Sequence, residues 1–490
     1  MDRQRRKAVQ DALRGVFGLQ NFRPGQKKAT KSLLSGRDLL CVLPTGAGKS
    51  LCWQLPAVVH PGLTVVVSPL IALMTDQVDG LRRKGIPAVA LNSLMTPQER
   101  QEAIQQLRTG GTRIVFVAPE RLPSDSFTEL CSQLDPWLLV VDEAHCIVQW
   151  GEDFRPAYGW IGEFIRLLPR RPVVCAMTAT ADARMQRQIM QNLGLHRPVR
   201  VMLPILRENL TYTACTASGV TAKLCQLMAE DPCRTVVFCR KRHHAEAYAG
   251  SLRRAGLAAD FYHAGLDRDA RTAAQERFRT GDTQILCATS AFGMGIDIPD
   301  IRRVVHAYVP WSILDLVQQS GRAGRDGLPA ECIVIITPRE LLWLCRSFWP
   351  FTVIGQGTPG LRESWAWSRT WRGVYRVLKL LMTRRCIPQA ISAAFGQRSG
   401  RCGRCSACRR GPLTRRVPDL QRRGIYATRM WLLKMQRAAL ARQRQTMPWR
   451  LADHGQMSEM ASSLTLPDSL QDAEIRAAMA RLMKAMGDDH

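Results

Sequence analysis

The chain has 490 residues, which is too long for one hydrophobic core, so two to four domains are expected. Hydrophobic residues make up 46% and charged residues 22% of it, and the longest apolar runs are strand-sized, which argues against a membrane-spanning segment. The net charge is +28, and residues 361–450 hold 22 Lys and Arg against the acids Glu363 and Asp419, which favours a polyanionic partner, nucleic acid before membrane.

Five short apolar segments, separated by helical stretches, are predicted as strands between residues 35 and 205. Each is apolar along its whole length and is followed by a polar or glycine-containing turn, as is typical of parallel strands buried on both faces. Their sequences are DLLCVLP, TVVVSP, RIVFVAP, WLLVVDE and VVCAMTAT.

A second series of the same kind begins near residue 207, with TVVFCR, AADFYHAG, QILCATS, RRVVHAYVP and ECIVIITP. Two such series in tandem predict an α/β fold with two parallel-sheet units wrapped by helices. From about residue 346 the pattern changes to helices rich in Trp and Arg, and the tail beyond residue 411 is also predicted to be helical.

A nucleotide-binding loop is predicted at CVLPTGAGKS, residues 41–50, which follows a strand and opens a helix. Backbone N–H groups at a helix N-terminus bind phosphate, Lys49 neutralises its charge, and Ser50 can reach Mg²⁺. Leu43 stands where the eight-residue P-loop pattern has its first glycine, but the rest of the pattern is intact. The predicted ATP-binding residues of this loop are Thr45, Gly46, Gly48, Lys49 and Ser50.

Two further segments carry candidate catalytic residues. In WLLVVDEAHC, residues 137–146, carboxylates follow a buried strand, so Asp142 is expected to hold Mg²⁺ and Glu143 to activate the attacking water. The role of His145 stays open between coupling ATP to the second unit and capping the turn.

The second of these segments is QQSGRAGRDG, residues 318–327, which lies late in a unit that has no P-loop of its own. Arg325 is predicted to reach across a cleft and stabilise charge on the transferred phosphate, with Arg322 as a phosphate-binding partner and Gln318 in the same catalytic set. A surface loop is the competing interpretation of two glycine-spaced arginines.

The order of these motifs resembles that of superfamily 2 helicases. The P-loop, DEAH, TAT at 178–180, AFGMGIDIP at 291–299 and QQSGRAGRDG occur in that order. Three more stretches make residues 10–410 similar to RecQ-type DNA helicases: FGLQNFRPGQ, SPLIALMTDQV and HCIVQWGEDFRP. The resemblance implies two RecA-like lobes that clamp ATP and drive 3′→5′ movement along single-stranded DNA, with unwinding of duplex DNA.

The resemblance also implies roles for residues outside the phosphate site. Arg23 and Gln26 are expected to contact adenine. QWGEDFRP corresponds to the aromatic-rich loop that senses DNA, where Trp150 and Phe154 stack on bases and Arg155 meets phosphate or base. The chain departs from the family pattern at four positions, which are Leu19 for an aromatic residue, Val148 for serine, Glu152 for histidine and Gln319 for an acid.

Three cysteines in RCGRCSACRR, at 402, 405 and 408, leave a redox cluster, a metal site and unrelated thiols as interpretations. Cys386 completes a C-x15-C-x2-C-x2-C spacing, which resembles the zinc-binding subdomain that follows the lobes of RecQ proteins. Four thiolates form a closed tetrahedral Zn²⁺ site without a catalytic position. We therefore expect Cys386, Cys402, Cys405 and Cys408 to bind structural zinc.

The expected domains are an ATP-binding lobe (1–205), a second RecA-like lobe (206–345), a helical zinc-binding subdomain (346–412) and a basic helical extension, HRDC-like in outline (413–490). A winged-helix pattern is not recognisable after Cys408. The predicted function is an ATP-dependent 3′→5′ DNA helicase of repair and recombination, with ATP, Mg²⁺ and Zn²⁺ as cofactors and single-stranded and duplex DNA as partners.

Three other functions are alternatives on the same motifs: a translocase that unwinds poorly, a zinc-stabilised DNA-binding scaffold with weak ATPase activity, and an RNA helicase. The basic N-terminal segment lacks an apolar signal core, so no export signal is expected. The compact architecture favours a cytoplasmic, nucleoid-associated location in a bacterium, with a basic eukaryotic nuclear protein as the alternative.

Overall fold

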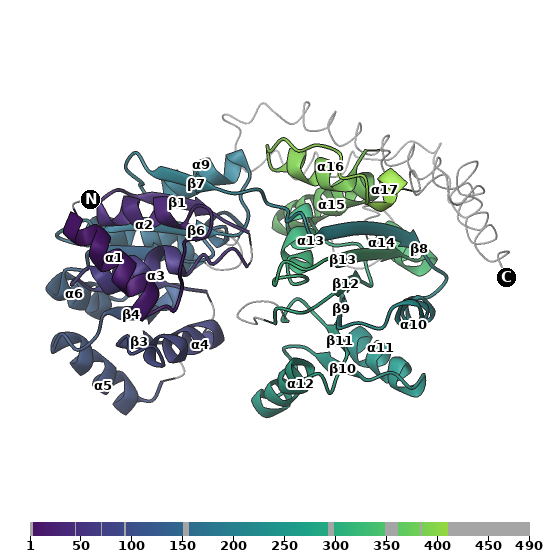
Figure 1. Cartoon of the computed structure of the whole chain (residues 1–490), viewed down its shortest axis with the longest axis horizontal. Helices are drawn as coiled ribbons and strands as arrows, with labels where there is room; N and C mark the ends of the chain where they lie inside the picture. The colour runs from purple at the N-terminus through teal and green to yellow at the C-terminus, as the bar shows by residue number, and fades with distance from the viewer. Residues whose placement is uncertain are drawn as a thin grey trace, which may run out of the picture.

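The computed structural model describes residues 3–409, apart from 45, 70, 93–94, 150–155, 293–297, 348–360 and 383–384. Two parallel sheets stand side by side, each with its own helices, and a third, helical segment lies on the second sheet (Figure 1). No helix in this part of the chain is both long enough and apolar enough to cross a membrane. The predicted C-terminal extension, residues 413–490, lies outside the described residues.

The first lobe contains a seven-stranded sheet in the order β3-β4-β2-β5-β6-β1-β7, and every pairing is parallel. All five strands predicted from the sequence are present. The sheet also has β3 and β7, which the sequence did not predict, because AVAL is weakly β-forming and VRVM is a half-exposed edge strand. The strands are β1 (Leu39–Val42), β2 (Thr64–Val67), β3 (Ala88–Leu91), β4 (Ile114–Val117), β5 (Leu138–Val141), β6 (Val173–Thr178) and β7 (Val199–Met202).

Helices cover both faces of this sheet because successive strand residues point to opposite sides. In β2, Val65 and Val67 belong to the core on one face, whereas Val66 belongs to the core on the other. The first core is closed by α5, α6, α8 and α9, and the second by α2, α3 and α4. The helices of this lobe are α1 (Arg3–Gly15), α2 (Gln26–Leu34), α3 (Leu51–Val59), α4 (Ile71–Arg82), α5 (Pro97–Arg108), η1 (Pro119–Arg121), α6 (Asp125–Leu134), α7 (Cys146–Gln149), η2 (Pro156–Gly159), α8 (Trp160–Leu167) and α9 (Ala183–Asn192).

The second lobe has a six-stranded parallel sheet in the order β10-β11-β9-β12-β13-β8. Its five predicted strands are present, and the edge strand β8 is additional; its alternating pattern LTYTACT buries one face only. The strands are β8 (Leu210–Thr216), β9 (Thr235–Phe238), β10 (Ala259–Tyr262), β11 (Ile285–Ala288), β12 (Arg303–His306) and β13 (Ala330–Ile336). The helices are α10 (Val220–Glu230), α11 (Arg242–Arg254), α12 (Arg268–Thr280), α13 (Ile313–Ser320) and α14 (Pro338–Ser347).

The described residues of 361–409 form a helical unit, here called the cysteine module, with α15 (Leu361–Leu381), α16 (Ile387–Ala394) and α17 (Ser406–Arg409). It shares one hydrophobic core with the second lobe, so Ile391 of α16 and Val334 of β13 belong to the same cluster. The Ser406 hydroxyl accepts a hydrogen bond from Ala214 N of the edge strand β8, at 3.0 Å. The module is therefore an extension of the second lobe (Figure 1).

Candidate ATP site and cysteine cluster

The predicted phosphate-binding loop lies between the end of β1 and the start of α3. Gly46 and Gly48 both have positive φ angles, +84° and +74°, which L side chains rarely adopt. A Cβ atom on Gly48 would lie 2.5 Å from Nε2 of Gln26, so the loop also needs glycine there for space. Thr45 lies outside the described residues.

The side chains of Arg23 and Gln26 both contact this loop. Nη1 of Arg23 donates to the Gly46 carbonyl at 2.8 Å, and Nε2 of the buried Gln26 donates to the Gly48 carbonyl at 3.0 Å. The other end of the Gln26 amide accepts from Arg23 N at 2.8 Å. The two side chains thus fix the path of the loop backbone, and their predicted contact with adenine stays a prediction. Leu19 is exposed.

Asp142 and Glu143 follow β5, as predicted, and Glu143 has a φ of +47°, uncommon for a residue other than glycine. Burial and the neighbouring Glu143 charge raise the pKa of Asp142 to about 6. Burial acts in the same direction on Glu143, but the charge of Lys49 and the hydrogen bond and charge of His145 outweigh it and lower its pKa to about 2. The site therefore holds a carboxylate that stays ionised beside Lys49.

His145 connects this carboxylate to both lobes. Its Nδ1 lies 3.2 Å from a Glu143 carboxylate oxygen and 3.0 Å from the Thr178 hydroxyl of the TAT motif. Its Nε2 lies 3.4 Å from the side-chain nitrogen of Gln318, which comes from α13 of the second lobe. His145 therefore lies between the two lobes, and its role stays a prediction.

The loop GRAGR, residues 321–325 and here called the arginine loop, faces the first lobe. A Cβ atom on Gly46 would lie 3.6 Å from Cγ of Arg325, so Arg325 reaches the phosphate-binding loop. The charge of Arg322 contributes to the low pKa of Glu143. The structure thus brings three predicted catalytic residues of the second lobe to the first. Gln318 lies beside His145, Arg322 acts on Glu143, and Arg325 lies beside Gly46. Gln319, by contrast, is buried and bonds to Tyr308 of its own lobe at 3.3 Å.

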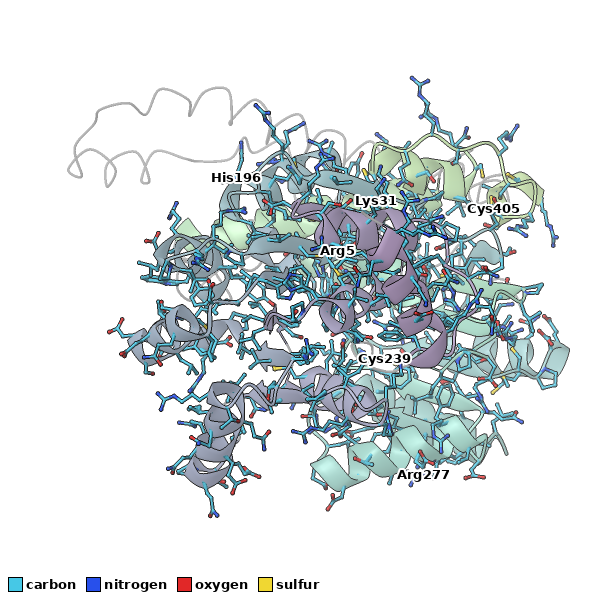
Figure 2. All side chains as sticks on the ribbon, turned by 60° about the vertical axis from the view of Figure 1, so that its left-hand side comes forward. Arg5, Lys31, His196, Cys239, Arg277 and Cys405 are labelled. Carbon is cyan, nitrogen blue, oxygen red and sulfur yellow. The ribbon has the colours of Figure 1, made fainter. Side chains whose placement is uncertain are left out.

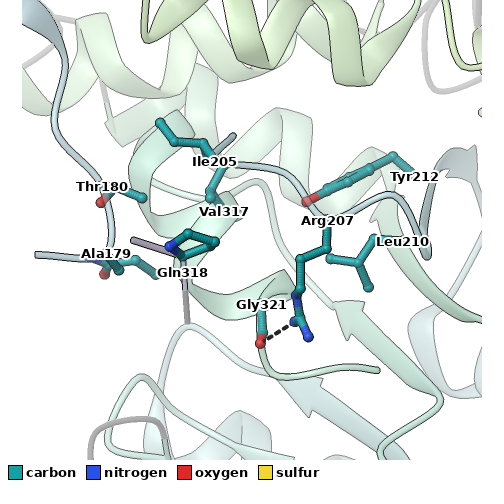
Figure 3. A pocket seen from close by; sticks show the side chains of 10 residues that line it. Ala179, Thr180, Ile205, Arg207, Leu210, Tyr212, Val317, Gln318 and Gly321 are labelled. Carbon is teal, nitrogen blue, oxygen red and sulfur yellow. Dashed lines mark hydrogen bonds between the residues drawn. The ribbon is translucent and has the colours of Figure 1, made fainter. Parts of the chain in front are cut away.

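Sequence reasoning missed Arg207, which holds the arginine loop in shape. Arg207 belongs to residues 203–209, here called the linker, between β7 and β8. Its guanidinium donates to the carbonyls of Gly321, Ala323 and Gly324 at 2.6, 2.7 and 2.8 Å. Figure 3 shows Arg207 and Gln318 lining a small interlobe pocket with Ala179 and Thr180. A single arginine outside any motif gives no signal in the sequence.

The predicted DNA-sensing loop is not placed. Trp150, Glu152, Phe154 and Arg155 lie outside the described residues. Val148, in α7 before that loop, is half-buried and packs against the core of the first lobe. A residue so packed needs no hydroxyl, which accounts for valine at this position.

The four cysteines predicted to bind metal lie together. The sulfurs of Cys386, Cys402, Cys405 and Cys408 are all within 4.8 Å of one another. Four sulfurs at about 2.3 Å from one Zn²⁺ are about 3.8 Å apart, so the cluster matches a tetrahedral zinc site in donor type and in size. Cys405, at the core of the cluster, is labelled in Figure 2.

Backbone N–H groups point at these sulfurs. Cys402 N lies 3.2 Å from Sγ of Cys386, Cys405 N 3.3 Å from Sγ of Cys402, and Ile387 N 3.4 Å from Sγ of Cys405. Burial raises the pKa of Cys402, but N–H groups of Cys405 and Arg404 outweigh it, so this pKa lies below its usual value. The backbone thus favours the thiolate, the form that binds metal, at Cys402, whereas burial raises the pKa values of Cys386 and Cys405. Cys41, Cys175, Cys239, Cys287 and Cys332 are buried, free thiols in the cores of the two lobes.

Comparisons with known proteins agree with this architecture. Residues 23–189 match the family model for DEAD/DEAH box helicases, and residues 219–327 match the helicase conserved C-terminal domain. The solved structure of the helicase MrfA bound to DNA and AMPPNP covers 82% of this chain and 59% of its own at 19% identity, with a TM-score of 0.59. The structure of Mycobacterium smegmatis helicase Lhr bound to ssDNA and AMP-PNP covers 79% of this chain and 58% of its own at 18% identity, with a TM-score of 0.55. At these identities the structures establish the fold alone.

Curated relatives are nearer in sequence. The ATP-dependent DNA helicase RecQ of Pasteurella multocida is 41% identical over 335 residues, 68% of this chain and 53% of that protein. RecQ of Bacillus subtilis is 35% identical over 403 residues, which are 82% of this chain and 66% of that protein. RecQ of Synechocystis is 38% identical over 344 residues, which are 68% of this chain and 71% of that protein. The match thus spans between about half and about seven-tenths of these relatives. With both helicase domains in place and relatives at this identity, the chain belongs to the RecQ family of DNA helicases.

Proposed function

We propose that this protein is an ATP-dependent DNA helicase that moves 3′→5′ on single-stranded DNA and unwinds duplex DNA in repair and recombination. The single observation that carries the proposal is the composite site between the lobes. The charges of Lys49 and of Arg322 from the second lobe both act on Glu143, and Arg325 lies beside Gly46 of the phosphate-binding loop, so residues of both lobes contribute to one site. When two lobes each contribute charged groups to one phosphate site, nucleotide hydrolysis can move one lobe against the other, as a motor requires.

In this proposal Lys49 and the N–H groups of residues 46–50 bind the β- and γ-phosphates of ATP. Ser50 and Asp142 are the oxygen donors that would hold Mg²⁺, which neutralises developing charge on the phosphates when bound. Glu143, which is ionised and lies 3.2 Å from Nδ1 of His145, accepts a proton from the attacking water. Arg325 stabilises the charge that develops on the transferred phosphate, and Arg322 binds the same group.

The proposed partner of the motor is DNA. The localised positive charge of residues 361–450 supports binding to phosphates, and Trp150, Phe154 and Arg155 are proposed to contact the strand and signal to the nearby DEAH motif. Trp150→Ala is expected to leave basal ATP hydrolysis intact while abolishing its stimulation by single-stranded DNA. Stimulation that survives this change would show that the loop does not couple DNA to hydrolysis.

The cysteine cluster is proposed to hold one structural Zn²⁺. Its supporting observations are the four sulfurs within 4.8 Å, two of them on fully buried residues, and the N–H groups aimed at them. All four positions of the metal are taken by protein, which leaves none for substrate. We further propose the domain division 1–205, 206–345, 346–412 and 413–490, and action in the bacterial cytoplasm at the nucleoid.

Strand displacement by the full chain tests the proposed function. Forked duplexes with either a 3′ or a 5′ single-stranded tail are incubated with ATP and Mg²⁺, and Lys49→Ala serves as the inactive control. Release of the strand from the 3′-tailed fork alone is expected. ATP hydrolysis stimulated by DNA without strand release would identify a translocase, and absence of any hydrolysis would leave a DNA-binding scaffold. Substitution of RNA for the tail separates an RNA helicase from a DNA helicase.

A further inference from the structure

The linker, residues 203–209, is anchored to three parts of the molecule. At its first residue, Leu203 N donates to the carbonyl of Val42 at 3.1 Å, and Val42 is the last residue of β1 before the phosphate-binding loop. Near its end, Arg207 bonds to three carbonyls of the arginine loop. The third anchor, between these two, comes from the cysteine module.

This third anchor is the side chain of Gln397. Its Nε2 donates to the Leu203 carbonyl at 3.1 Å, and its Oε1 accepts from Ile205 N at 2.9 Å. One amide thus satisfies a backbone acceptor and a backbone donor two residues apart, as a neighbouring strand would. Pro204, which lies between them, has no N–H, and Gln397 bonds to the backbone groups on either side of it.

Gln397 is itself held in position. It follows Gly396, whose φ of +73° ends α16, and its own N–H donates to the Ser392 carbonyl at 2.9 Å. The side chain of Ile205 is 3% exposed and lies in the same core as Phe395 of the module. Apolar packing therefore fixes the distance between linker and module, while the two hydrogen bonds fix the register of the linker backbone.

We propose that Gln397 is a positioning residue for ATP turnover, which couples the cysteine module to the arginine loop by fixing the linker that carries Arg207. The inference rests on the proposed function, because it names a residue that acts on ATP hydrolysis from outside the site. Loss of these two hydrogen bonds frees the linker backbone next to Arg207, so the arginine loop loses its fixed position opposite the phosphate-binding loop.

A first measurement needs no activity. Hydrogen exchange of the linker amides is followed in the full chain and in Gln397→Ala, Gln397→Glu and Gln389→Ala. Gln389 is the matched control, because it belongs to the same module and bonds to the Ser399 carbonyl, not to the linker. Exchange at Ile205 is expected to rise about tenfold in Gln397→Ala. It is expected to stay near the wild-type rate in Gln389→Ala and to be intermediate in Gln397→Glu, whose carboxylate still accepts from Ile205 N but cannot donate to the Leu203 carbonyl.

A second measurement follows DNA-stimulated ATP hydrolysis and metal content in the same proteins. We expect Gln397→Ala to lower kcat roughly 5- to 10-fold with KM for ATP and metal content unchanged, Gln397→Glu to recover part of kcat, and Gln389→Ala to match the wild type. A normal kcat in Gln397→Ala, or a fall that follows metal loss across the variants, overturns the inference. A wild-type chain without ATPase activity sensitive to Lys49→Ala rejects the proposed function instead.

Discussion

The side-chain nitrogen of Gln318 lies 3.4 Å from Nε2 of His145, which makes these two residues a direct polar contact between the lobes. His145 in turn contacts Glu143, the proposed catalytic base, so a shift of the second lobe changes the surroundings of that carboxylate. Two side chains that lie 173 positions apart in the chain can report lobe closure to the hydrolytic residue.

Gln318→Ala removes this contact and is expected to lower DNA-stimulated kcat roughly 3- to 10-fold, because His145 loses its polar contact with the second lobe. Basal hydrolysis without DNA is expected to change less, because Glu143 keeps its contact with His145. Steady-state ATPase assays with and without single-stranded DNA measure both rates. Gln226→Ala, an exposed glutamine on α10 bonded to Lys223 and Glu230, is the control. An equal fall of both rates would argue against a role in coupling.

Gly48→Ala is expected to lower ATP binding and turnover at least about tenfold, since the new methyl group needs the space of Gln26 Nε2 and a φ of +74°. Gly36→Ala is the matched control. It has a similar φ of +70° but open space around it, so it is expected to lower the free energy of unfolding by about 1 kcal/mol without changing turnover. Equal turnover in the two variants would show that the contact with Gln26 is not needed.

Arg207→Lys is expected to lower kcat about 10- to 100-fold, because one ammonium group cannot reproduce the fork that meets three carbonyls. The metal content and the affinity for single-stranded DNA are expected to stay at wild-type values, since Arg207 contacts neither proposed site. Arg166→Lys is the control for replacing an arginine by a lysine, because Arg166 is exposed and pairs locally with Glu163. Full activity in Arg207→Lys would mean that the arginine loop keeps its shape without the fork.

Cys405→Ser is expected to abolish stoichiometric zinc binding and to lower the melting temperature of the second lobe with its module, because Cys405 is fully buried in their shared core. Cys225→Ser, a half-buried thiol of α10 outside the cluster, is expected to retain zinc. Metal analysis and calorimetry, each before and after treatment with a chelator, measure the two effects. Unchanged zinc content in Cys405→Ser would remove this residue from the ligand set.

Chemistry that lies on short stretches of chain was predictable from the sequence. A glycine-rich turn after a buried strand, the acids that end β5 and the arginines of GRAGR each have a local pattern, and the spacing of four cysteines indicated one metal site. The strands that the sequence missed, β3, β7 and β8, lie at sheet edges or have weak β propensity, so only pairing with their neighbours makes them strands.

The sequence by itself determined the residue types of the phosphate site and of the thiol cluster, and the alternation that builds two parallel sheets. Only the tertiary structure decided which distant groups meet, because such contacts depend on how the lobes and the module pack. The contacts of Gln318 with His145, of Arg207 with the arginine loop and of Gln397 with the linker have no local pattern. In each case one polar side chain contacts polar groups that are distant in the sequence and that only folding brings near it.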